Sequence, residues 1–234
     1  MKTIGSHECR NQSTSIVLLG SFNPSIFQPY WFGQHNLIRP SEADTAKVEI
    51  LSAEVTVLDL NWCKLQVFQD RFVAKALDEA HQQPLLDLVL GVFTLLEHTP
   101  IRALGLNIEG HYQMHSEQEW HAFGHYYAPK ETWGKLIDHP GLQKQVINGT
   151  RKSTLAKRVQ VTISPSDTLT SGVFIHVNQH YETEDGTTAN ASNNIQWALD
   201  IIRNEFPEFV TYVDKVASTL LGDALAAFGR GGQN

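Results

Sequence analysis

Hydrophobic residues recur along the chain with two periods, which separate the predicted strands from the predicted helices. Between residues 101 and 114, apolar residues alternate with polar ones, and a period of two is typical of a strand with one buried face. Between residues 83 and 98, Leu, Val and Phe recur at spacings of one, three and four, which predicts a helix packed on a core. The chain therefore contains both element types.

The same order of elements is predicted twice along the chain. The first half contains a strand, a short helix, two extended segments and a long helix, at residues 15–22, 25–37, 48–60, 64–76 and 83–98. The second half repeats this order at residues 101–114, 116–137, 155–164, 172–184 and 193–228. Ser116 and Glu119 have capping-box spacing at the start of the second of these segments.

This recurrence predicts an α+β protein built as a tandem β-α-β-β-α duplication. The halves run from 15 to 99 and from 100 to 229, and WFGQH at 31–35 has its counterpart in AFGHY at 122–126. The expected product is one compact unit with a curved antiparallel sheet and helices on one face, of TATA-binding-protein-like or ferredoxin-like topology. The comparison concerns topology and implies no DNA binding.

Composition and charge narrow the class of protein. The 234 residues are 41% hydrophobic and 18% charged, which is typical of an ordinary globular chain. A net charge of −7 argues against a protein that wraps nucleic acid over its whole surface. Two cysteines without CxxC spacing exclude a disulfide framework and a four-thiolate zinc site. With no signal-peptide core and no stretch long enough to span a membrane, the cytoplasm is the expected location.

The segment SFNPSIFQPYWFGQHNLI at 21–38 concentrates three Phe, a Tyr and a Trp. It lines a ligand pocket in one interpretation and forms a structural junction in the other. Asn23-Pro24 ends the preceding strand, and Pro29 permits a helix that begins at that point. We favour the junction, in which the aromatic residues pack the short helix onto its sheet and against the other half.

Polar residues of one parity define a candidate binding face on two predicted strands. Because residues two apart in a strand share a face, these side chains are expected on a common sheet surface: Asn107, Glu109, His111, Gln113, His176, Asn178 and His180. The surface is either the solvated side of an antiparallel sheet or a site for a peptide, a nucleic acid or a small molecule.

Four histidines within fifteen residues suggest a metal site: His111, His115, His121 and His125. His121 and His125 are one helical turn apart, which is metal-ligand spacing, and nearby glutamates complete a candidate set for a metal-dependent hydrolase. The general-base glutamate of HExxH is absent from HAFGH. Exposed or helix-packing histidines are the alternative, and no cofactor is predicted.

One stretch is rich in basic residues and free of acidic ones, from 144 to 158: Lys144, Arg151, Lys152, Lys157 and Arg158. It could contact phosphates or an acidic partner, or form a solvated loop. The later segment 183–194 has the composition of a loop, which could act as a lid. No nucleophile elbow and no phosphate-binding glycine motif occurs.

The stretch GSFNPSIFQPYWFGQHNLI, with LQVFQDRF and RALGLNIEGHYQ, resembles a sporadically distributed, uncharacterised prokaryotic family with an FNPxIFxPxWF-like N-terminal signature. The resemblance covers most of the chain and implies no activity and no catalytic residue. A patchy distribution implies mobile gene neighbourhoods, such as phage-defence or toxin and immunity loci.

Together these observations predict a non-enzymatic cytosolic binding or adaptor protein, a component of a multi-protein or homo-oligomeric assembly. No complete catalytic set occurs, while two helix-backed units offer a broad polar face. The alternatives are the metal-dependent hydrolase based on His111 to His125 and a nucleic-acid-binding protein based on Lys144 to Arg158.

Overall fold

The computed structural model describes residues 2–4, 7–183 and 191–231, and within them the fold is α+β. The strands are β1 (Lys2–Ile4), β2 (His7–Gly20), β3 (Lys47–Leu51), β4 (Val55–Asp59), β5 (Cys63–Phe68), β6 (Arg71–Ala76), β7 (Ile101–Gln113), β8 (Gln145–Gly149), β9 (Arg158–Pro165) and β10 (Gly172–Glu182). The helices are α1 (Pro29–Gln34), α2 (Pro40–Thr45), α3 (Gln82–Leu95), α4 (Glu117–Tyr127), α5 (Lys130–Trp133) and α6 (Ala191–Gly231), with 3₁₀ turns at Pro24–Ile26 and Glu79–His81.

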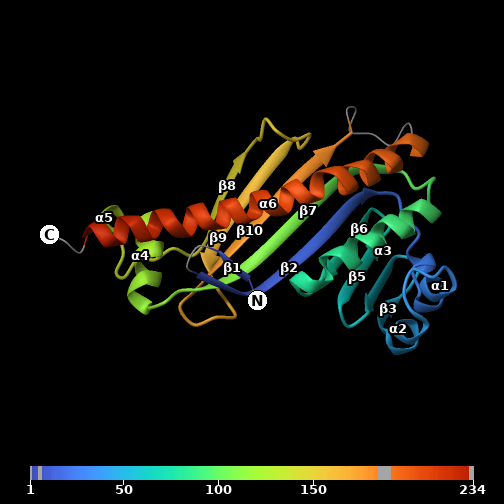
Figure 1. Ribbon diagram of the computed structural model, residues 1–234, viewed down its shortest axis with the longest axis horizontal. Helices are drawn as coiled ribbons and strands as arrows, with labels where there is room; N and C mark the ends of the chain where they lie inside the picture. Colours follow the sequence, from blue (N-terminus) through green and yellow to red (C-terminus); the bar gives the residue numbers. More distant parts are fainter. Residues whose placement is uncertain (1, 5–6, 184–190, 232–234) are drawn as a thin grey trace.

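All ten strands form one open antiparallel sheet (Figure 1). Its order is β3-β4-β5-β6-β2-β7-β10-β9-β8, and β1 pairs with β2 outside this path. The leading strands of the two halves, β2 and β7, lie side by side at the centre. Each also pairs with the last strand of its own half, β2 with β6 and β7 with β10. The two halves therefore share a single sheet.

The two central strands pair because both carry the same alternation. Their register places Thr14 opposite Ile108 and Ile16 opposite Leu106, so that apolar residues of both strands point to the same face. Ile16, Leu106 and Ile108 are buried there. A slip by one residue would turn these side chains toward the opposite face, so burial specifies the register.

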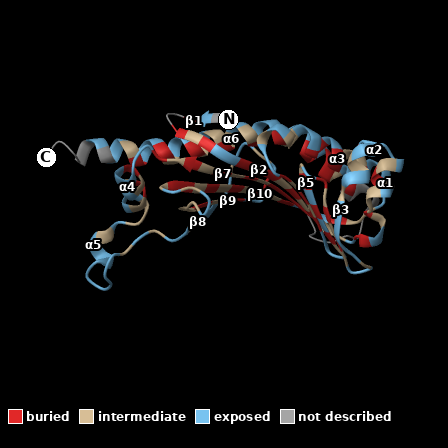
Figure 2. Ribbon diagram, turned by 90° about the horizontal axis from the view of Figure 1, so that it is seen from below, coloured by how far each residue is buried: buried red, intermediate tan, exposed pale blue. Residues whose placement is uncertain are grey.

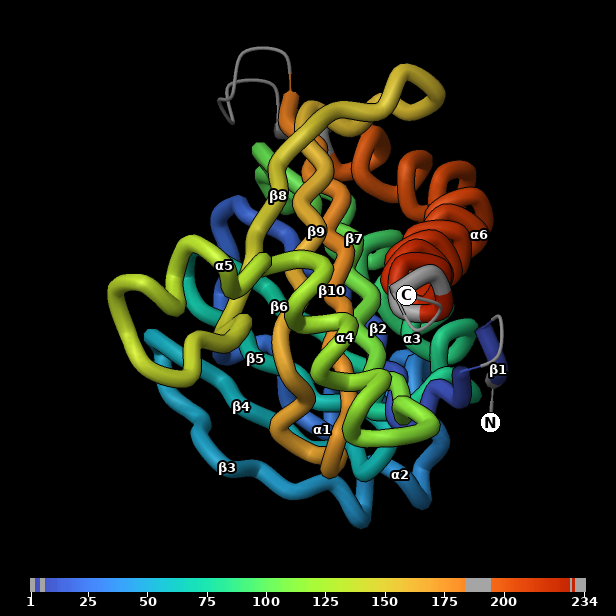
Figure 3. Tube along the Cα trace, turned by 90° about the vertical axis from the view of Figure 1, so that its left-hand side faces the viewer, coloured from blue at the N-terminus to red at the C-terminus, as the bar shows by residue number. Residues whose placement is uncertain are grey.

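The long helices cover one face of the sheet and leave the other uncovered (Figure 2). Helices α3 and α6 lie on the convex side, where α6 contacts β7, α3 and α4. Viewed along α6, the helix stands to one side of the strands, while α5 and β8 extend beyond the opposite side (Figure 3). The sheet is curved, and its concave face is the side away from α3 and α6.

The apolar rings of the segment 21–38 are buried in the core, as the junction interpretation predicts, but their ring contacts lie within the first half and not against the other half. These rings pack with Phe72 of β6 and Phe93 of α3, with ring centroids 5.0–6.3 Å apart, and they are Phe22, Phe27 and Phe32. The predicted helix 25–37 is divided, because Gln28 is extended between the 3₁₀ turn and α1. Tyr30 is 71% exposed and takes no part in this core.

Several strand predictions are wrong in number or extent. The segments 48–60 and 64–76 each contain a hairpin, β3–β4 and β5–β6, where one strand was expected. The first of these turns lacks glycine and proline: the Ser52 hydroxyl accepts hydrogen bonds from the amides of Glu54 and Val55. Strand β2 begins at His7, and α2 and β8 were not predicted. The predicted order β-α-β-β-α therefore underestimates the number of strands in each half.

The end of the chain agrees more closely with the prediction. Helix α6 runs through Pro207 without ending. Residues 184–190 of the predicted loop and candidate lid at 183–194 lie outside the described residues, and Ala191 begins α6. Of the helices described, none is long and apolar enough to cross a membrane.

Truncating Phe27 to Ala is expected to lower the free energy of unfolding by about 3–5 kcal/mol, because it opens a cavity in the aromatic core. Truncating the neighbouring Tyr30 to Ala is the matched control, with an expected change of about 0.5 kcal/mol or less, since this ring is exposed. Urea unfolding measures both. Equal losses would contradict the junction described for this segment.

Candidate functional site

The concave face gathers the polar residues predicted for the sheet surface. Strands β7 and β10 pair with Asn107 opposite Asn178 and Glu109 opposite His176. His111 lies opposite Phe174 in the same ladder. Because directly opposite residues of an antiparallel pair share a face, these side chains form one contiguous surface.

Asn107 is the centre of this surface. Its Oδ1 accepts a hydrogen bond from Asn178 Nδ2 at 2.8 Å and lies 3.2 Å from His176 Nε2. Its Nδ2 donates to the Ser15 carbonyl of β2 at 3.4 Å. A Cβ at Gly105 would approach Asn178 Nδ2 to 3.3 Å, so the missing side chain leaves room for the two amides.

Glu109 connects the two halves of the concave face. Its carboxylate accepts a hydrogen bond from Ser13 Oγ of β2 at 2.8 Å and forms an ion pair with Lys75 of β6. Burial by itself raises the pKa of Glu109, but the bonds from Lys75 and Ser13 outweigh it and hold the pKa below its ordinary value of 4.5. The carboxylate is therefore charged and neutralised by Lys75 at pH 7.

The two central histidines of this face are neutral at physiological pH. Burial lowers the pKa of both His111 and His176 below the ordinary value of 6.5. His111 Nδ1 lies 2.8 Å from Ser166 Oγ, in the loop before β10. Neutral imidazoles both donate and accept hydrogen bonds, so they suit polar recognition.

The remaining predicted residues lie toward the ends of these strands. Gln113 donates to the Thr170 carbonyl at 2.9 Å, and His180 Nε2 lies 2.7 Å from Glu182. Asn107, Asn178 and His176 thus bond to one another, and the other polar groups of the face bond to neighbouring residues. Such an arrangement holds hydrogen-bonding groups in fixed positions.

The other half of the concave face contains valines among polar and charged residues, an apolar component that the sequence analysis missed. Three half-buried valines have the concave parity on β2, β4 and β6, namely Val17, Val57 and Val73. Charged residues of the same parity lie around them: Asp59, Lys64, Arg71 and Lys75. Val17 lies opposite Gly105, so this apolar area adjoins the amide pair of Asn107 and Asn178. The alternation of residues with a period of two along these strands was the sequence signal that could have indicated these valines.

The structure does not bring the four predicted metal-ligating histidines together. His111 belongs to the concave face, whereas His121 Nε2 lies 3.6 Å from Glu117 and His125 Nε2 lies 3.1 Å from Glu131. The metal site predicted from the spacing of His121 and His125 is wrong, because each of these exposed imidazoles lies beside a different carboxylate. His115 alone joins a group with ligand geometry.

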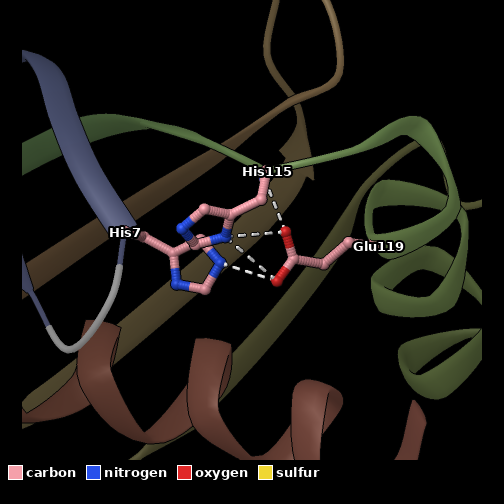
Figure 4. Close-up of side chains that lie close together, drawn as sticks. All are labelled: His7, His115 and Glu119. Atoms are coloured by element: carbon pink, nitrogen blue, oxygen red, sulfur yellow. Dashed lines mark hydrogen bonds and ion pairs between the residues drawn. The ribbon is translucent and has the colours of Figure 1, made fainter. Parts of the chain in front are cut away.

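That group consists of His7, His115 and Glu119 (Figure 4). His7 Nε2 lies 3.1 Å from Glu119 Oε1, and His115 Nδ1 lies 3.1 Å from Glu119 Oε2. Among the described residues it is the one cluster of three His, Cys, Asp or Glu side chains close enough to hold a metal ion. The sequence contained no local signal for His7, because more than one hundred residues separate it from its partners.

The predicted basic segment does not form one free patch. Arg151 donates to Glu208 of α6 at 2.7 Å, and its guanidinium stacks on Tyr212 at 3.8 Å. The other basic residues are exposed but spread along β8, the following loop and the start of β9: Lys144, Lys152, Lys157 and Arg158. One of the five basic side chains of the segment, Arg151, is thus already engaged in contacts within the protein.

A pocket of about 490 Å³ lies beside α4. Its lining is largely apolar, with Trp120 and Phe123 from the helix and Val173 from β10. His139, in the left-handed region with a φ of 50°, stands at its rim in the loop that follows α5. No sequence motif indicated this pocket.

Replacing Lys75 with Met is expected to destabilise the protein by about 1 kcal/mol at pH 7, because the partly buried Glu109 loses its cation. In the wild type, Glu109 adds stability above its unfolded-state pKa and loses it as pH falls through the lowered folded-state pKa. In Lys75→Met, burial raises the pKa of Glu109, so stability is lost as pH rises above the unfolded-state value.

The difference in unfolding free energy between the wild type and Lys75→Met should therefore be largest at pH 7 and shrink toward about pH 4. Urea titrations at both pH values measure it. Lys64→Met is the control, because Lys64 lies 3.9 Å from Asp59 and is half exposed. A difference for Lys75→Met that does not change with pH would contradict the role given to Glu109.

No protein-family model matches the chain, and no curated protein sequence matches it.

Proposed function

We propose that the protein is a non-enzymatic binding protein that holds a partner polypeptide against its concave sheet face. The observation that carries this proposal is the pairing of β7 with β10, which places Asn107, Asn178 and His176 in one fixed array on the face without long helices. Such an array offers several hydrogen-bonding groups in one orientation.

A polypeptide is the occupant that fits both chemistries of the face. The polar half presents amides and neutral imidazoles, which bond to backbone and side-chain groups alike. The first-half part of the face presents Val17, Val57 and Val73, whose burial favours association, beside charged side chains that can pair with a polypeptide. Protein interfaces typically combine an apolar area with hydrogen bonds in this way.

We further propose that the two halves, 15–99 and 100–229, arose by tandem duplication and form a TATA-binding-protein-like or ferredoxin-like arrangement. Three features support this proposal: the central pairing of β2 with β7, the pairing of each with the last strand of its half, and a helix at the end of each half on the convex side. In this arrangement the concave face is continuous across both halves.

The proposed binding role also suggests a cellular setting. We propose that the protein acts as a component of a cytoplasmic multi-protein assembly, with a protein partner or a second copy of the chain. A phage-defence or toxin and immunity setting rests on the family resemblance alone and stays a prediction.

The alternatives have weaker support. A metal-dependent hydrolase based on His111, His115, His121 and His125 would need these side chains in one place. Nucleic-acid binding through Lys144 to Arg158 would need Arg151 free of Glu208 and Tyr212.

A photo-crosslinking amino acid placed at Gln66 of β5 or Gln160 of β9 is expected to capture a partner polypeptide in the native host. Both positions have the concave parity, since Gln66 lies opposite Val57 and Gln160 opposite Asn178. The same amino acid at Thr219, exposed on α6, is the matched control. Mass spectrometry of the covalent products identifies the captured chain.

Capture at Gln66 and Gln160 that exceeds capture at Thr219 is the expected result. Equal capture at Thr219 would move the interface to the convex side. A monomer without a covalent product at any position would remove the proposed function.

A further inference from the structure

Three metal-binding side chains from separate segments converge beside α4. His7 begins β2, His115 lies between β7 and α4, and Glu119 is in the first turn of α4. Their ligand atoms all lie within 4.8 Å of one another, and the two imidazole rings are 4.8 Å apart at an angle of 59°. Figure 4 shows both rings turned toward the carboxylate.

The carboxylate is held in place before any ligand binds. Glu119 Oε2 accepts a hydrogen bond from the backbone amide of His115 at 2.6 Å, and the Ser116 hydroxyl accepts one from the amide of Glu119 at 3.1 Å. The predicted capping box is thus formed in part, with the glutamate turned to His115 instead of Ser116. Hydrogen bonds of this kind orient metal ligands in proteins.

Burial differs sharply among the three groups. His7 is 1% exposed and the Glu119 side chain 9%, whereas the His115 side chain is 58% exposed. The cluster is therefore closed on the side of the protein and open to solvent at His115. A closed inner side excludes competing ligands, and an open outer side admits an ion and a water molecule.

The donor set matches that of zinc, and the nitrogen–oxygen separations within it are close to those of a zinc site. Two imidazole nitrogens and one carboxylate oxygen form a His₂Glu set, which binds zinc in four-coordinate sites with water as the fourth ligand. Bonds of about 2.0–2.1 Å in a tetrahedral site place donor atoms about 3.3 Å apart. The separations of 3.1 and 3.4 Å between the imidazole nitrogens and the carboxylate oxygens are close to this value.

We propose that His7 Nε2, His115 Nδ1 and the Glu119 carboxylate bind a divalent transition-metal ion of the zinc class, with water as the fourth ligand. The ion joins the start of β2 to the loop and helix that follow β7. It thereby fixes the N-terminal end of the central strand against the second half. The site is independent of the proposed polypeptide binding on the concave face.

The test is metal binding by untagged, chelator-treated protein. Isothermal titration with Zn²⁺ is expected to give one equivalent, and Co²⁺ is expected to give the visible absorption of a tetrahedral site. His115→Gln is the decisive variant, because its exposed side chain can be replaced without opening the core. It should weaken Zn²⁺ binding at least ~100-fold, since even the groups that orient a ligand contribute 10–100-fold.

His121→Gln is the matched control, since His121 is a similarly exposed imidazole in the adjacent helix α4. Its affinity for Zn²⁺ should be within about twofold of that of the wild type. Zn²⁺ should raise the melting temperatures of the wild type and of His121→Gln, but not that of His115→Gln. A wild-type protein that leaves excess Zn²⁺ unbound would overturn the proposal. Equal affinity in His115→Gln and the wild type would overturn it too.

Discussion

The antiparallel ladder between β2 and β7 is the contact on which the rest of the structure depends. It is the only ladder of the described sheet that joins the strands of the first half to those of the second. Its backbone hydrogen bonds are specified in register by the burial of Ile16, Leu18, Leu106 and Ile108 beneath the helices. Without it, each half would expose the edge of its leading strand.

The same ladder assembles the concave face. Ser13 and Ser15 of β2 bond to Glu109 and Asn107 of β7, and Lys75 reaches Glu109 from β6. The polar centre therefore draws on both halves, and the apolar area begins where Val17 meets Gly105. Helices α3 and α6 take the convex side, so that the helix-packed core and the proposed binding surface lie on opposite faces of one sheet.

The sequence predicts what depends on local periodicity. The strand 101–114, the helix 83–98 and the common face of Asn107, Glu109, His176 and Asn178 all follow from spacing along one element, and the structure has each of them. The hairpin at Ser52 was missed because a serine side chain closes it without glycine or proline. Strand β8 was missed because it lies in a basic, polar stretch whose pairing with β9 is not visible in its own sequence.

Long-range contacts explain the remaining errors at the candidate sites. The spacing of His121 and His125 is that of a metal site, yet each lies within ion-pair distance of a different glutamate, Glu117 or Glu131. His7 has no local motif, and only the fold brings it to His115 and Glu119. The sequence predicts Arg151 to be a surface cation, but its guanidinium stacks on Tyr212 of α6, a helix that begins forty residues later.

Native-state hydrogen exchange of the β2 and β7 amides tests the central claim most directly. If one ladder unites the sheet, these amides exchange most slowly, and strands of both halves lose protection in the same global opening. Separate opening of β3–β6 and of β8–β10, with β2 and β7 amides exposed in either event, would show two independent units and contradict the account.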